Sequence, residues 1–138
     1  MKEEIMNLAF KESLKCLKTK DIPVGAVIVN NNKIIAKAHN ERVKKKNPLA
    51  HAEVNAIIKA SKKIKNYNLN DCELYVTLKP CSMCYSIISN AKLKNVYYLL
   101  EKPSYKKEYM TNCINMQTNV CEEYKNILSK FFKDLRNK

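Results

Sequence analysis

The chain has 138 residues and a formal net charge of +13, from 26 Lys and Arg against 13 Asp and Glu. This length fits one domain with a core that needs no disulfide, despite the six cysteines. A signal peptide and a long apolar run are both absent, which argues against a secreted or membrane-spanning protein and predicts a cytoplasmic chain with reduced thiols. The charge alone does not identify a nucleic-acid partner, because Lys supplies nearly all of it and compositional bias gives the same excess.

The first part of the chain predicts one helix followed by two strands. Apolar residues recur every three or four positions over residues 3–18, which is typical of an amphipathic helix. Two apolar runs, 24–29 and 34–38, flank Asn30-Asn31-Asn32 and predict antiparallel strands joined by a tight turn. Gly25 is the only glycine, so it marks either a close backbone approach or a simple strand entry.

The rest of the chain alternates between the same two kinds of element. Helices are predicted over 52–64, 81–90 and 122–136, and strands over 73–78, 95–100 and, less regularly, 114–120. Residues 104–112 are polar and aromatic and give no clear pattern. This order predicts one α/β domain over residues 1–138, with three layers (α-β-α) around a mixed sheet of about five strands.

Two short segments carry the candidate chemistry: His51-Ala52-Glu53 and Pro80-Cys81-Ser82-Met83-Cys84. One His and two Cys can bind Zn²⁺ and leave its fourth position to water, with Glu53 nearby to move protons. Both segments fall at predicted helix starts, where the positive end of the helix dipole favours a thiolate. Cys81 and Cys84 are three residues apart, so both sulfurs can lie on one side of the first turn and chelate one ion.

Two other interpretations of the CxxC pair stay open at this point. The pair could be redox-active, or it could be half of a structural zinc site whose fourth ligand is Cys72, Cys113 or Cys121. A redox pair would not need His51, and a structural site would not need Glu53. The combination of HxE with PCxxC about 30 residues later therefore favours a catalytic zinc site.

These motifs resemble the cytidine-deaminase-like superfamily, and within it the bacterial tRNA-specific adenosine deaminases. The similarity also covers residues 21–27, Asn40, residues 48–53 and 74–78, and the Phe-Phe-basic ending of the last helix. It implies one catalytic Zn²⁺ per chain, held by His51, Cys81 and Cys84. Glu53 would pass protons between the zinc-bound water and the base, converting adenosine to inosine at the wobble position of a tRNA.

The resemblance also implies the contacts that the substrate makes. Asn40 would hydrogen-bond a flipped-out nucleoside, and Val24 and Ala52 would contact the base. Pro80 and Lys79, next to Cys81 in the sequence, are also predicted to line the substrate site, where the Lys79 charge would either suit a phosphate or simply be solvated. Stacking and phosphate contacts to the tRNA anticodon loop are predicted for residues of the last helix: Phe131, Phe132, Lys133 and Arg136. A homodimer is expected. The aromatic residues Tyr85, Tyr97 and Tyr98 are either exposed interface anchors or part of the core.

Two departures from the family pattern leave the substrate open. A Gly-Ala-Arg-Asp-like stretch and a Gly/Ala-rich loop normally follow the fourth strand, whereas residues 99–109 here are shorter and lack glycine. Lys79 stands where an acidic residue normally precedes Pro-Cys. The alternative function is therefore a deaminase of a small nucleobase or nucleoside, namely guanine, cytosine or adenosine. A non-enzymatic alternative is a zinc-stabilised RNA-binding module.

Overall fold

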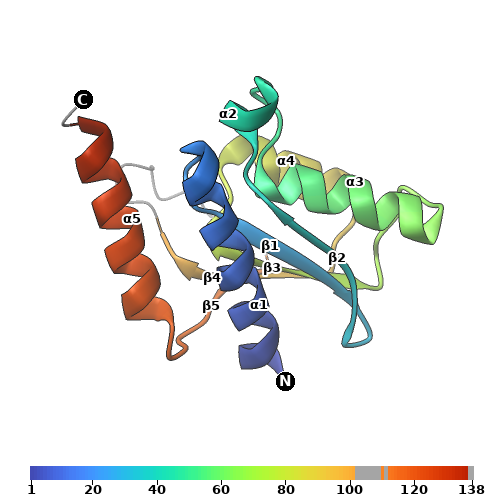
Figure 1. Ribbon diagram of the computed structural model, residues 1–138. Coiled ribbons are helices and arrows are strands. Elements are labelled where there is room, and N and C mark those ends of the chain that lie inside the picture. The colour runs from blue at the N-terminus through green and yellow to red at the C-terminus, as the bar shows by residue number, and fades with distance from the viewer. Residues whose placement is uncertain (102–109, 111, 137–138) are drawn as a thin grey trace.

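The computed structural model describes residues 1–101, 110 and 112–136 (Figure 1). Its elements in chain order are α1 (Lys2–Leu14), the 3₁₀ helix η1 (Lys15–Thr19), β1 (Gly25–Asn30), β2 (Lys33–His39), α2 (Arg42–Lys45), α3 (Ala52–Ile64), β3 (Cys72–Leu78), α4 (Ser82–Asn90), β4 (Asn95–Leu100), β5 (Cys113–Asn115) and α5 (Cys121–Arg136). No helix among the described residues is long and apolar enough to cross a membrane.

The strands form one mixed sheet in the order β2-β1-β3-β4-β5. β1 runs antiparallel to both of its neighbours, and β3, β4 and β5 run parallel to one another. Helix α1 lies along β1 and β3 on one face, and α3 and α4 lie together on the other face (Figure 1). The predicted three-layer α/β fold with a five-stranded mixed sheet is therefore confirmed.

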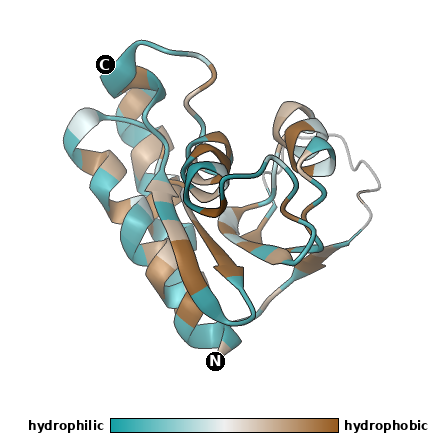
Figure 2. Cartoon of the chain, turned by 90° about the vertical axis from the view of Figure 1, so that its right-hand side faces the viewer, coloured by the Kyte–Doolittle hydropathy of each residue, from teal (hydrophilic) through white to brown (hydrophobic). Residues whose placement is uncertain are grey.

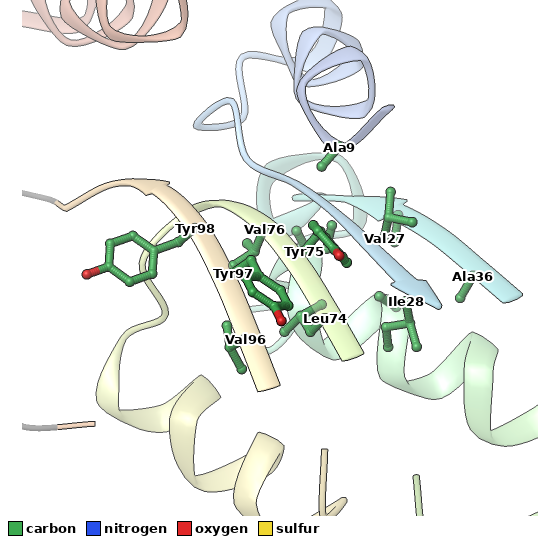
Figure 3. Packing of buried hydrophobic residues seen from close by; sticks show 14 of the residues in the cluster. Ala9, Val27, Ile28, Ala36, Leu74, Tyr75, Val76, Val96, Tyr97 and Tyr98 are labelled. Carbon is green, nitrogen blue, oxygen red and sulfur yellow. The ribbon is translucent and has the colours of Figure 1, made fainter. Parts of the chain in front are cut away.

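Alternating side chains of the strands supply the two layers of the core. Figure 3 shows Val27 pointing toward Ala9 of α1, whereas its neighbour Ile28 points to the face covered by α3. Both side chains are fully buried, as a two-sided core requires. In Figure 2 the strands carry long hydrophobic stretches, whereas hydrophilic and hydrophobic bands alternate along the helices.

Gly25 is required by a close approach between α1 and β1. A Cβ atom at this position would lie 1.9 Å from the Ala9 carbonyl oxygen and 2.6 Å from the Ser13 nitrogen. No side chain fits at these distances, so the first of the two interpretations of this glycine holds. The contact sets how closely α1 packs on the start of β1. Val24, a predicted substrate-binding residue, directly precedes this point in the chain.

Helix α2 was not predicted, because its stabilising contact comes from a distant residue. The buried Asp21 carboxylate accepts hydrogen bonds from the backbone N–H groups of Val43 (2.5 Å) and Lys44 (3.3 Å). These are free N–H groups in the first turn of a short helix, and a carboxylate there stabilises it. Local sequence patterns carry no sign of a capping residue more than 20 positions away.

Three further expectations need correction. Tyr97 and Tyr98 are only 5% and 7% exposed in the single chain, so they are core residues of β4 and not exposed interface anchors, while Tyr85 is half-buried. The strand predicted over 114–120 is β5, with three residues, because polar side chains beyond it bond locally. The helix predicted over 3–18 changes to 3₁₀ geometry after Leu14. Most of the segment 104–112 lies outside the described residues.

Candidate active site

The two predicted motifs stand at the starts of two neighbouring helices. His51 is the N-cap residue of α3 and Cys81 is the N-cap residue of α4, both in extended backbone conformation. Pro80 sits just before α4, where its missing N–H costs nothing. The expected helix starts are confirmed, and α3 and α4 lie side by side on the same face of the sheet.

The three candidate ligands meet at distances that suit one ion. The Nδ1 atom of His51 lies 3.5 Å from the Cys84 sulfur and 4.0 Å from the Cys81 sulfur, and all three atoms lie within 4.8 Å of one another. A tetrahedral zinc ion with ordinary Zn–N and Zn–S bonds separates such atoms by about 3.5 Å. The donor set and its spacing therefore fit zinc.

A fourth protein ligand is not found in the part of the chain that the structure describes. There, His51, Cys81 and Cys84 form the sole group of three or more potential ligands within reach of one ion. Cys72 is buried elsewhere in β3, and the Cys121 sulfur accepts a hydrogen bond from the Thr118 N–H. The ligand triangle is thus of the open kind that is typical of catalytic zinc.

The electrostatics of the two thiols also favour a cation. Hydrogen bonds from Cys84 and His51 lower the pKa of Cys81 to about 3, so a thiolate is favoured at this position. The hydrogen bond with Cys81 and burial both raise the pKa of Cys84. The two shifts have opposite directions, and a bound divalent cation would stabilise both sulfurs as thiolates.

Glu53 is buried beside the triangle, in the first turn of α3. Glu53 is 4% exposed and lines one small cavity together with His51 and Cys81. Burial raises the pKa of Glu53 to about 7. A carboxyl group in this range can both take up and release a proton at neutral pH, which is the requirement for general acid–base work.

This cavity, called the site cavity below, has a volume of about 80 Å³. It contains most of the substrate-binding residues expected from the sequence. Its lining consists of Ile22, Val24, Asn40, Arg42, His51, Ala52, Glu53, Leu78, Lys79 and Cys81. Pro80 is buried and is not part of this lining, so the structure does not bring it together with the other predicted substrate-binding residues. Ile22, Arg42 and Leu78 were missed, although Arg42 is one of only two arginines among many lysines.

Asn40 and Lys79 are both held by other residues of the chain. The Asn40 side chain donates to the Ile22 carbonyl (3.1 Å) and accepts from the Arg42 N–H (3.2 Å). The Lys79 ammonium lies 2.9 Å from Glu101, and its side chain is 17% exposed. Asn40 keeps one N–H and one lone pair for a ligand, whereas the charge of Lys79 is already paired.

A second cavity of about 360 Å³ adjoins the site cavity and shares Ile22, Asn40 and Arg42 with it. On its far side lie Phe131 and Leu135 of α5. Three basic residues, Lys20, Arg42 and Lys46, contribute to its lining, together with Asp21, whose carboxylate is bonded to α2. The predicted nucleic-acid residues differ in availability. Phe132 packs against the core, Phe131 faces the cavity, and Lys133 and Arg136 are exposed.

Comparison with known proteins agrees with this geometry. The family model of the cytidine and deoxycytidylate deaminase zinc-binding region matches residues 1–100. A tRNA-specific adenosine deaminase of Aquifex aeolicus is 36% identical to this protein in an alignment that covers 99% of this chain and 97% of the relative.

Two solved structures are also similar. A tRNA:A34 deaminase that edits A to I at the wobble position has a TM-score of 0.74 at 28% identity, covering 82% of this chain and 97% of that one. A guanine deaminase of Bacillus subtilis has a TM-score of 0.68 at 30% identity, covering 99% of this chain and 94% of that one. The chain thus belongs to the cytidine and deoxycytidylate deaminase family, whose defining zinc-binding region contains the His51, Cys81 and Cys84 triangle.

Proposed function

We propose that this protein is a zinc-dependent hydrolytic deaminase that converts adenosine to inosine at the wobble position of a tRNA. The observation that carries the proposal is the open ligand triangle of His51, Cys81 and Cys84 with Glu53 buried beside it in one cavity. The substrate class is supported by relatives that are named tRNA-specific adenosine deaminases and that align with nearly the whole length of this chain.

The proposed chemistry divides between the ion and the chain. Zinc, when bound, lowers the pKa of water and so supplies a hydroxide nucleophile near neutral pH. Glu53 would take up the proton that the water releases and deliver it to the ring nitrogen of the base as the hydroxide adds to C6. In a second transfer it would carry the proton of the added hydroxyl group to the amine, which leaves as ammonia when the C–N bond breaks. Its burial keeps bulk water away from these transfers, and its place in the site cavity lets one carboxyl group serve both.

The remaining residues of the site cavity bind the nucleoside. Val24 and Ala52 supply the apolar wall, and Asn40 offers its remaining N–H and lone pair to the base or ribose. A base inside this cavity has left its stack, so the substrate is a nucleotide in a loop or a free nucleoside.

The adjoining cavity supports an RNA substrate over a free base. It continues from the site cavity to Phe131 of α5, with Arg42, Lys20 and Lys46 on its rim. Aromatic side chains stack on unpaired bases and basic side chains contact phosphates, and neither interaction requires a particular RNA sequence. We assign the anticodon-loop contacts to Phe131, with Lys133 and Arg136 beyond it, and a supporting role to the half-buried Phe132.

We also propose that the protein works as a cytoplasmic homodimer. Two large apolar side chains near α3, Leu49 and Ile58, are 56% and 48% exposed in the single chain. Pairing with a second copy would remove such surface from water. Light scattering of the purified protein tests this: a mass near 32 kDa, twice the 16.0 kDa of the chain, is expected.

The deciding experiment compares two kinds of substrate. The zinc-loaded protein is incubated with an anticodon stem-loop containing adenosine at the wobble position, and separately with free guanine, cytosine and adenosine. Ammonia release and product mass are followed. Inosine in the stem-loop is expected. Rapid turnover of free guanine with an unchanged stem-loop would instead show that this protein is a guanine deaminase, like its relative from Bacillus subtilis. Zinc-dependent RNA binding without any deamination would establish an RNA-binding module.

A further inference from the structure

A buried tyrosine links the C-terminal helix to the wall of the site cavity. Tyr124 of α5 is fully buried, and its hydroxyl group donates a hydrogen bond to the Pro23 carbonyl oxygen at 2.8 Å, 101 residues away in the chain. The same hydroxyl oxygen accepts a hydrogen bond from the Thr77 hydroxyl at 2.9 Å. Thr77 in turn accepts one from the Gly25 N–H at 3.1 Å.

These bonds form a chain that begins and ends on the peptide groups that flank Val24. The Gly25 N–H lies on one side of Val24 and the Pro23 carbonyl on the other, and Thr77 and Tyr124 connect them. Val24 itself lines the site cavity and is 8% exposed. The two hydroxyl groups therefore fix the backbone of the residue that forms this wall.

The carbonyl group of Val24 is held from the opposite side. It accepts hydrogen bonds from the Asn40 N–H at 3.0 Å and from the buried Cys16 thiol at 3.6 Å. Burial raises the pKa of Cys16 to about 11, so the thiol keeps the proton that it donates. Val24 is thereby fixed relative to Asn40, the proposed nucleoside-binding residue, as well as to α5.

Packing alone does not explain the Tyr124 hydroxyl. Its ring meets Phe10 edge-on at a centroid distance of 6.1 Å, and a phenylalanine ring would make the same contact. A buried hydroxyl is costly unless it is bonded, and here both of its bonds lead to the wall of the site cavity.

We infer that Tyr124 and Thr77 are positioning residues, which fix Val24 and thereby set which purine base the site cavity prefers. The inference rests on the proposed function, since it concerns the base that enters the same cavity. Misplacement of a wall by a fraction of an ångström changes which bases fit, and it changes their relative rates more than the overall fold.

The test measures a ratio that loss of folded protein cannot change. Two stem-loops are prepared that differ at one base, adenine or 2,6-diaminopurine, and kcat/KM is measured for each with wild type, Tyr124→Phe, Thr77→Val and Thr77→Ser. A loss of folded enzyme scales both values equally, whereas a displaced wall alters their quotient. Thermal unfolding of each variant is recorded in parallel.

Tyr124→Phe and Thr77→Val are each expected to change the quotient of the two kcat/KM values by about fivefold or more. The double variant should show no greater change than the larger single one, because both changes break the same link. Thr77→Ser retains the hydroxyl group and should keep the wild-type preference within about twofold. If Tyr124→Phe does not fold, the two Thr77 variants decide.

Equal losses on both substrates for Tyr124→Phe and Thr77→Val would overturn the inference, as would a Thr77→Ser variant that behaves like Thr77→Val. Failure of the proposed function gives a different result, namely a wild-type protein that forms no inosine. If that protein converts free guanine, the same quotient is taken between guanine and 2,6-diaminopurine as free bases, and an unchanged quotient again overturns the inference.

Discussion

The Lys79 ammonium lies 2.9 Å from a carboxylate oxygen of Glu101, which ties the residue two positions before Cys81 to the end of β4. The Lys79 N–H also donates to the Leu100 carbonyl at 2.8 Å, and the Tyr98 hydroxyl donates to Glu101 at 3.3 Å. The basic residue that departs from the family pattern is therefore part of a local clamp. Its ammonium is engaged with the chain before any substrate arrives.

A charge exchange tests what Lys79 does. Lys79→Glu places two carboxylates together and should lower kcat/KM for the stem-loop by about tenfold or more. The exchange Lys79→Glu with Glu101→Lys restores the opposite charges, and should recover activity to within about threefold of wild type. An exchanged protein as poor as Lys79→Glu alone would mean that the ammonium itself contacts the substrate.

Gly25 should tolerate no side chain. Gly25→Ala forces its new methyl group against the Ala9 carbonyl and the Ser13 N–H, so α1 must move away from β1. The expected loss is about 3 kcal/mol or more of unfolding free energy, measured by urea denaturation. Ser86→Ala on the exposed side of α4 is the control and should change stability by no more than about 0.5 kcal/mol. Equal stability of the two variants would refute the close approach.

Zinc content should depend on Cys84 and not on Cys121. Cys84→Ser removes one of three ligands and should leave well under one zinc per chain, measured by elemental analysis of protein purified without added metal. Cys121→Ser alters a thiol bonded to its own loop and should retain one zinc per chain. Loss of zinc from both variants would indicate a closed structural site that includes Cys121.

The ionised Glu12 carboxylate should stabilise the folded state at neutral pH, and acid should remove this stabilisation. Burial alone would raise its pKa, but hydrogen bonds from Lys15 and His39 and their positive charges hold the pKa of Glu12 below the ordinary 4.5. Folding therefore favours the ionised form. This stabilisation is full above about pH 5 and is lost as pH falls through the lowered pKa.

Glu12→Gln should accordingly cost about 1 kcal/mol near neutral pH, and the difference from wild type should shrink as the pH falls toward 3. Lys11→Gln, at an exposed position of the same helix, is the control and should show no such trend with pH. If the unfolding free energies of Glu12→Gln and wild type differed by a constant amount across this pH range, the ionised Glu12 carboxylate would not be the source of the stabilisation.

The local parts of the fold and site were predictable from the sequence. Helix starts at His51 and Cys81 follow from Pro80 and from apolar residues at helical spacing, and the ligand spacing follows from the first turn of α4. The contacts that were missed join residues far apart. Asp21 bonds to α2, Glu101 to Lys79 and Tyr124 to Pro23, and no local pattern carries such pairs.

Burial of aromatic residues was also hard to predict. The sequence leaves open whether Tyr97 is exposed, because its side chain combines an apolar ring with a polar hydroxyl group. In the structure its ring stacks on Tyr75 at a centroid distance of 4.8 Å, and its hydroxyl reaches Glu73 and Lys2 at the edge. Which face of a strand is covered depends on helices elsewhere in the chain, here α1.

The most direct test of the proposed mechanism replaces Glu53 with glutamine. The neutral side chain keeps nearly the same shape but moves no proton, so zinc should remain at one per chain and the melting temperature should stay close to that of wild type. Inosine formation in the anticodon stem-loop, followed by product mass, should fall by about 10³-fold or more. Inosine formation within tenfold of the wild-type rate would contradict the role of Glu53 and with it the proposed mechanism.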